Sequence, residues 1–124
     1  MAKLTRIKNF YKLAQIEYNK YKNSKDKDLE GADHLAEAGE KLWNVYNMLC
    51  EYITKQKIRN EKQLRNELTK YSNKTGDYKL ASMYRNTYEL HIYFYRGHAN
   101  TDFEEGIFNE LNMELGKLIS RFVY

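Results

Sequence analysis

The chain has 124 residues and no proline, and 31% of its residues are charged. This length suits a single domain over residues 1–124, and the helically spaced apolar residues exclude a disordered chain. No stretch approaches the roughly 20 apolar residues of a membrane span, and no apolar run follows the Lys-rich start. We therefore expect a cytoplasmic protein without membrane contact. The single cysteine, Cys50, lies in an apolar stretch and is expected to be buried rather than reactive.

The net charge of +4 is unevenly distributed along the chain. Residues 1–27 carry a balance of +6 and residues 55–74 a balance of +5, whereas 28–54 and 101–124 carry −5 and −3. Two interpretations stay open. The segments neutralise one another within a bundle or dimer, or the two basic segments form a surface for phosphates.

Apolar residues that recur every three or four positions predict five helices. The first two cover about 4–21 and 29–54, with the polar segment 23–28 between them. Gly39 interrupts the apolar pattern of the second helix, and a close contact with another helix is the usual compensation for such a glycine. The third helix, about 60–72, is short and basic and has a narrow apolar edge.

The fourth helix covers about 78–95 and is apolar nearly all round at its end, so we expect it to be enclosed, for example by a second subunit. After the loop 96–100, Thr101 and Glu104 match a capping box, which opens a fifth helix that ends near Phe122. Five helices with short connections predict an all-α, up-and-down bundle.

Arg85, Asn86 and His91 are the candidate catalytic residues. Metal-independent RNA cleavage needs a group that moves a proton near neutral pH, which histidine supplies. It also needs a positive fork on the phosphate oxygens, which arginine supplies, while asparagine can orient either group. Six residues of helix turn by about 600°, so the Arg85 and His91 side chains lie roughly 120° apart. They meet only through the length of arginine, a local distortion or a two-fold axis. The alternative for His91 is a hydrogen-bonded histidine on a buried helix.

The other motifs give weaker evidence for a catalytic or ligand-binding site. There is no glycine-rich phosphate loop, paired-cysteine site or His-Glu-x-x-His, so we expect no cofactor and no metal. Arg96 and His98 form a second candidate pair, for which an ordinary exposed loop is the simpler interpretation. The twelve tyrosines, several beside lysines, either stack on bases or pack with their hydroxyls in water.

Three segments resemble signatures of the archaeal PaREP family. The stretch Ala38–Trp43 is similar to its second-helix signature, and Glu89–Tyr95 is similar to its Leu-His-x-x-Phe-Tyr signature. The acidic stretch Thr101–Gly106 is similar to the start of its last helix. The resemblance covers about residues 29–120 and leaves out the basic N-terminal helix and loop, 1–28.

The resemblance implies a dimeric helical domain, because the PaREP family is grouped with the HEPN superfamily. Many HEPN proteins are metal-independent ribonucleases of toxin–antitoxin, CRISPR and antiviral systems, with an Arg-x(4–6)-His motif onto which Arg85, Asn86 and His91 fall. One departure is that His91 lies before another helical turn, whereas HEPN nucleases usually carry the histidine near a helix end. Other HEPN domains are inactive partners.

Two functions from different classes are therefore expected. The first is a HEPN-like homodimer that binds or cleaves RNA in a defence or toxin–antitoxin type system. The alternative is a non-catalytic dimeric module that binds nucleic acid or a partner protein through its basic helices. A third option is a structural protein whose charges serve only assembly.

Overall fold

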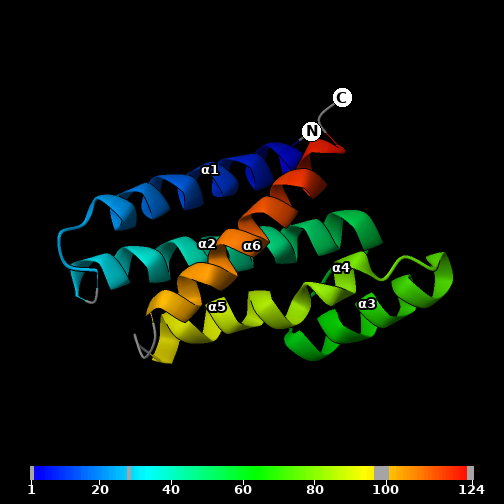
Figure 1. Cartoon of the computed structure of the whole chain (residues 1–124). Helices are drawn as coiled ribbons and strands as arrows, with labels where there is room; N and C mark the ends of the chain where they lie inside the picture. The colour runs from blue at the N-terminus through cyan, green and yellow to red at the C-terminus, as the bar shows by residue number, and fades with distance from the viewer. Residues whose placement is uncertain (1, 28, 97–100, 123–124) are drawn as a thin grey trace.

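The computed structural model describes residues 2–27, 29–96 and 101–122, and every regular element among them is helical. The elements are α1 (Ala2–Asn23), α2 (Glu30–Thr54), α3 (Glu61–Thr75), α4 (Lys79–Ser82), α5 (Tyr84–Arg96) and α6 (Thr101–Ser120), shown in Figure 1. The predicted all-α class is confirmed. Within these described ranges, no helix has the length and hydropathy needed to cross a membrane.

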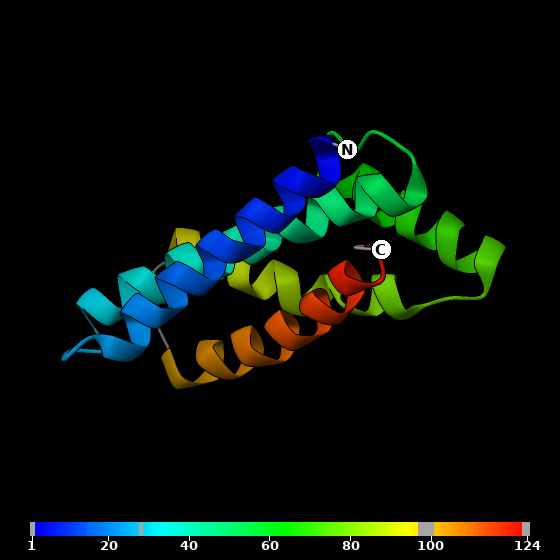
Figure 2. The ribbon, with the colours of Figure 1, turned by 90° about the horizontal axis from the view of Figure 1, so that it is seen from above.

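The central helix is α2, which contacts α1, α3, α5 and α6. Helices α1, α2 and α5 lie side by side, and α6 crosses one face of this layer (Figures 1 and 2). Helices α3 and α4 lie at one end of the molecule. The core is built mainly from fully buried residues of α1, α2, α5 and α6, among them Ile7, Tyr21, Leu42, Tyr46, Leu90 and Phe108.

The segment 78–95, predicted as one helix, is divided in the structure into α4 and α5 at Met83. The cause is a buried side chain of α2. The Tyr46 hydroxyl donates to the backbone carbonyl of Leu80 at 2.6 Å. In an unbroken helix that carbonyl would accept from the amide of Tyr84, four residues on. The Leu80 carbonyl instead accepts from the Tyr46 hydroxyl and, at 3.4 Å, from the amide of Met83, which leaves α4 as a single turn before α5.

A close contact between α2 and α5 occurs at Gly39, as its place inside a helix predicts. A Cβ atom added to Gly39 would lie 3.2 Å from Cβ of Leu90, which is tighter than an ordinary packing contact. Because Glu40 and His91 follow these two residues in the chain, the same contact brings them opposite each other.

Three tyrosines of α1 are packing residues. The Tyr11 hydroxyl donates to the backbone carbonyl of Asn112 at 2.8 Å. The Tyr18 and Tyr21 hydroxyls donate to the carboxylate of Glu105 at 3.1 and 2.8 Å. For these three side chains the packing interpretation is confirmed, although their hydroxyls bond to α6 instead of water.

The capping box predicted at the start of α6 is not formed, because Thr101 and Glu104 share no hydrogen bond within the described part of the chain. Glu104 is instead 7% exposed, and its Oε2 is buried without a hydrogen-bond partner among those residues. Burial, together with the charge of Glu89, raises its pKa to about 7. Cys50 is buried as predicted, and burial raises the pKa of its thiol.

Candidate active site

His91 of α5 is bonded to Glu40 of α2. Its Nδ1 lies 2.8 Å from Oε1 of Glu40, and their side chains remain 21% and 16% exposed. An ionised carboxylate can only accept a hydrogen bond, so Nδ1 carries the proton in this pair. The bond holds the imidazole in one orientation while part of the ring still reaches solvent.

Two aromatic rings flank the imidazole of His91. The indole of Trp43 stacks on it, with ring centroids 4.8 Å apart and an angle of 23° between the planes. The ring of Tyr88, three residues before His91 on α5, has its centroid 6.1 Å from that of the imidazole. Trp43 lies three residues after Glu40, so both reach His91 from the same side of α2. We call His91, Glu40, Trp43 and Tyr88 the His91 site.

Burial controls the protonation of the carboxylate in the His91 site. It raises the pKa of Glu40 above the ordinary range, and the hydrogen bond from His91 offsets this increase only in part. The neighbouring Glu37 raises the pKa of Glu40 further, and Lys41 lowers it. A carboxylate in this position orients an imidazole and stabilises its protonated form, which is the arrangement that general acid–base catalysis uses.

Arg85 and Asn86 do not join His91 within one chain. Arg85 is exposed and Asn86 is half-buried. No hydrogen bond or ion pair among the described residues connects either of them to His91. Helix α5 is continuous from Tyr84 to Arg96, so there is no local distortion that would turn Arg85 toward the imidazole. Of the three ways in which Arg85 and His91 were expected to meet, the one that remains is a dimer in which each side chain comes from a different subunit.

A different arginine lies beside the aromatic residues that lead to His91. Nη1 of Arg65, on α3, donates to the hydroxyl of Tyr84 at 3.4 Å. The Tyr84 ring stacks on Tyr88 at 5.8 Å, and Tyr88 in turn lies beside His91. A row of half-buried rings therefore extends from α3 to the imidazole.

Sequence reasoning missed Glu40, Trp43 and Arg65 as site residues. The first two belong to the Ala38–Trp43 stretch, in which their spacing of three places them on one helix face. A signal was therefore present, but it did not say that this face meets His91. Nothing in the sequence connects Arg65 to the site, because the contact depends on where α3 lies.

Two further expectations bear on the site. His98 lies outside the described residues, so the structure says nothing of the pair it would make with Arg96. Among the described side chains, no group of three or more His, Cys, Asp or Glu residues could hold a metal ion. The His91 site itself contributes two such side chains, His91 and Glu40.

Comparisons with protein-family models, curated proteins and solved structures find no match to this chain. The resemblance to the PaREP family and the HEPN superfamily therefore stays a prediction. The function of the His91 site has to be argued from its own contacts, burial and charge.

Proposed function

We propose that this chain is a HEPN-like, RNA-binding homodimer and that His91 cleaves RNA without a metal ion. The observation that carries the proposal is the partly exposed imidazole of His91, held by Glu40 and stacked on Trp43. Such an imidazole is oriented, partly shielded from water and within reach of a ligand. These are the properties that a general acid or base requires.

In the proposed reaction, His91 accepts the proton of a ribose 2′-hydroxyl as its oxygen attacks the adjacent phosphorus. A bond from O2′ to phosphorus forms and the bond from phosphorus to O5′ breaks. The imidazolium then returns the proton to the leaving 5′-oxygen. The products are a 2′,3′-cyclic phosphate and a 5′-hydroxyl. Glu40 acts as a positioning residue, which stabilises the imidazolium while it carries the proton.

Arg85 has its role in a dimer in which two α5 helices face each other across a two-fold axis. Its guanidinium, which is exposed in one chain, would stabilise the charged phosphorane at the His91 site of the partner subunit. Asn86 would orient the phosphate or the arginine. The site is then composite, with the imidazole from one subunit and the cation from the other.

The test is cleavage of labelled RNA by the purified protein in EDTA. Replacing His91 by Ala is expected to lower the rate by about 10²–10⁴-fold, the usual contribution of general acid–base catalysis. His34→Ala is the matched control, because His34 also bonds to a glutamate on a neighbouring helix, and it is expected to change the rate by less than about threefold. Cleavage that persists in His91→Ala contradicts the proposal.

Mixing two inactive variants tests the composite site. His91→Ala and Arg85→Ala chains are each expected to be inactive alone. After subunit exchange about half of the dimers are mixed, and each mixed dimer holds one complete site, so about a quarter of the wild-type rate should return. A mixture that stays inactive, although mixed dimers are detected, would contradict the composite site, because Arg85 would then act within its own chain.

A second candidate function is RNA binding without cleavage, and one observation favours it. The basic start of α1 lines the same groove as Ile58, which lies between the exposed side chains of Lys57 and Arg59 just before basic α3. Phosphate binding at this surface predicts an affinity for RNA that falls by tenfold or more between about 50 and 200 mM salt, without turnover. An affinity that does not change with salt would remove phosphate contacts from this candidate.

A further inference from the structure

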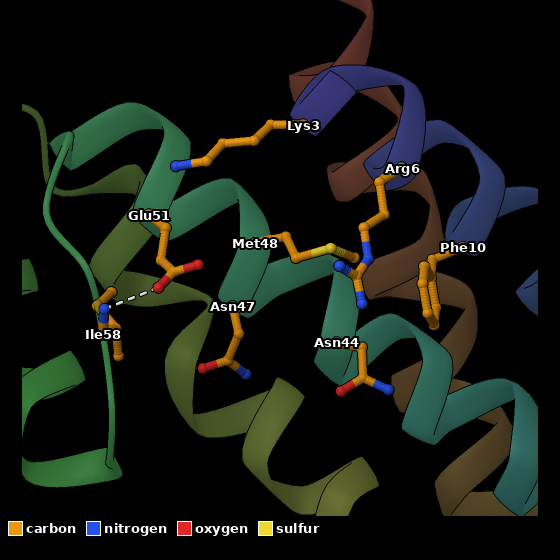
Figure 3. A pocket seen from close by; sticks show the side chains of 8 residues that line it. All are labelled: Lys3, Arg6, Phe10, Asn44, Asn47, Met48, Glu51 and Ile58. Atoms are coloured by element: carbon orange, nitrogen blue, oxygen red, sulfur yellow. Dashed lines mark hydrogen bonds between the residues drawn. The ribbon is translucent and has the colours of Figure 1, made fainter. Parts of the chain in front are cut away.

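A groove separates the first turns of α1 from the second half of α2. It has a volume of about 460 Å³, within the usual range for small-ligand sites, and residue 58 closes one end. Figure 3 shows Lys3 and Arg6 extending from α1 across the groove toward α2. Both cations are exposed, so the groove presents positive charge to solvent at its α1 wall.

An aromatic ring lies next to these cations. The guanidinium carbon of Arg6 lies 5.7 Å from the centre of the Phe10 ring, which is half-buried. A cation within about 6 Å of a ring centre is attracted to the ring face, so positive charge and apolar surface lie next to each other here. This surface fits a ligand that joins an anion to a flat ring.

The α2 wall supplies amide groups. Asn44 is half-buried and makes no hydrogen bond to another described residue. Asn47 donates through Nδ2 to the backbone carbonyl of Trp43 at 2.8 Å, which fixes its side chain. Amides of this kind offer both a donor and an acceptor, the combination that recognises the edge of a nucleobase.

The carboxylate in the groove is already engaged. Oε2 of Glu51 accepts from the backbone amide of Ile58 at 2.8 Å and so holds the segment that closes the groove (Figure 3). Its charge disfavours an anion at that end. A phosphate is therefore expected at the opposite end, near Arg6 and Phe10.

The groove and the His91 site share one face of α2. Glu40, Asn44, Asn47 and Glu51 follow one another at intervals of four, three and four residues, which places them on one stripe of the helix. Asn44 lies one turn, about 6 Å along the axis, from Glu40. This distance is close to the spacing of successive nucleotides in an extended single strand.

We propose that the groove binds one nucleotide of single-stranded RNA, next to the phosphodiester at His91. Arg6 binds its phosphate, Lys3 adds positive charge at the α1 wall, Phe10 packs against its base, and Asn44 with Asn47 bonds to the base edge. The inference rests on the proposed function, because it identifies the groove as the neighbouring subsite of the same strand. A free nucleotide also joins a phosphate to a base, and the experiment below distinguishes it from an RNA strand.

The experiment measures binding to the full-length His91→Ala chain by calorimetry, so that cleavage does not interfere. The probes are AMP, adenosine, inorganic phosphate and a five-residue oligoadenylate. The oligonucleotide is expected to bind at least tenfold more tightly than AMP, and AMP at least tenfold more tightly than adenosine or phosphate. If AMP binds as tightly as the oligonucleotide, the groove is a site for a free nucleotide, and the proposal that it binds single-stranded RNA is wrong.

Variants locate the binding. Combined replacement of Lys3 and Arg6 by Gln is expected to weaken the oligonucleotide about tenfold or more, and Phe10→Leu about fivefold. Lys12→Gln is the matched control, since Lys12 is an exposed α1 cation outside the groove, and it should change the affinity by less than about twofold. Helicity and thermal midpoint are measured for each variant to show that it is folded.

The two proposals fail separately. If the groove variants bind like the parent while wild-type protein cleaves RNA, the groove inference is wrong and the His91 mechanism stands. If the wild-type protein cleaves nothing while oligonucleotide binding depends on Arg6 and Phe10, the mechanism is wrong and the groove inference stands.

Discussion

His34 and His91 each bond through Nδ1 to a glutamate on a neighbouring helix. The distances are 2.9 Å to Glu17 and 2.8 Å to Glu40, and the imidazoles are 27% and 21% exposed. The pKa values of the two carboxyl groups are nevertheless shifted in opposite directions. The pKa of Glu17 is lowered from its ordinary value, whereas the pKa of Glu40 is raised.

The difference comes from what surrounds each pair. Burial acts to raise the pKa of Glu17, but hydrogen bonds from His34 and from Lys20, whose Nζ lies 3.3 Å away, outweigh it. At the other pair burial prevails, and Trp43 covers one face of the imidazole. The same kind of bond therefore occurs in two settings: at one pair hydrogen bonds lower the pKa of the carboxyl, and at the other burial raises it.

Removing the Trp43 side chain is expected to have the largest effect on the difference between the two histidine–glutamate pairs. The side chain is 8% exposed, so Trp43→Ala should lower the free energy of unfolding by about 3–4 kcal/mol. Water admitted to the cavity should also lower the pKa of Glu40 toward that of Glu17. Urea unfolding and carboxyl titration by NMR measure the two effects. Tyr78→Ala, at a 59% exposed aromatic, is the control and should stay within about 0.5 kcal/mol.

Glu104 extends the series to a buried carboxyl whose Oε2 has no hydrogen-bond partner among the described residues, and its pKa is about 7. Because folding raises the pKa of Glu104, the protein is most stable at pH values below the pKa that this carboxyl has in the unfolded chain. That stability is lost as the pH rises through about 7. Glu104→Gln should therefore stabilise the protein by about 2 kcal/mol at pH 8 and lose this gain toward pH 4. Denaturation at both pH values measures this, with the exposed Glu110→Gln as control. An equal effect at both pH values would contradict the assignment.

Double-mutant cycles give the smallest expected effect and compare the two pairs directly. At pH 6 the coupling energy between His91 and Glu40 should be about 1 kcal/mol, and that between His34 and Glu17 below about 0.5 kcal/mol. Raising the salt to about 0.5 M should weaken the coupling between His34 and Glu17 more, because the side chains of that pair are more exposed to solvent. Equal couplings with equal salt dependence would show that the aromatic cover has no energetic effect.

The helices were largely predictable, since apolar spacing reports the face that each helix buries. The boundaries of α2 and α3 lie within three residues of those predicted. The division at Met83 was not predictable, because the hydroxyl that competes for the carbonyl of Leu80 comes from Tyr46, which is distant in sequence. The capping box failed for a related reason: local spacing does not reveal that Glu104 is buried against other helices.

The site was predictable to a smaller extent. His91 was selected for the proton chemistry of imidazole, which is a property of the residue itself. The partners of His91 were not predictable, because its bond to Glu40 joins positions that are 51 residues apart in the sequence. The 120° between Arg85 and His91 followed from helix geometry, and the continuous α5 shows no distortion that would bring them together in one chain.

Residues a few positions apart were enough to predict most of the helical segments, their apolar faces and a close contact at Gly39, because these are local properties of the chain. The packing of the helices was needed to show that this contact pairs His91 with Glu40, that Trp43 covers the imidazole, and that a cationic groove opens on the same face of α2. These features depend on how helices approach one another, and the burial and hydrogen bonds that shift the pKa of each carboxyl exist only once the helices have packed.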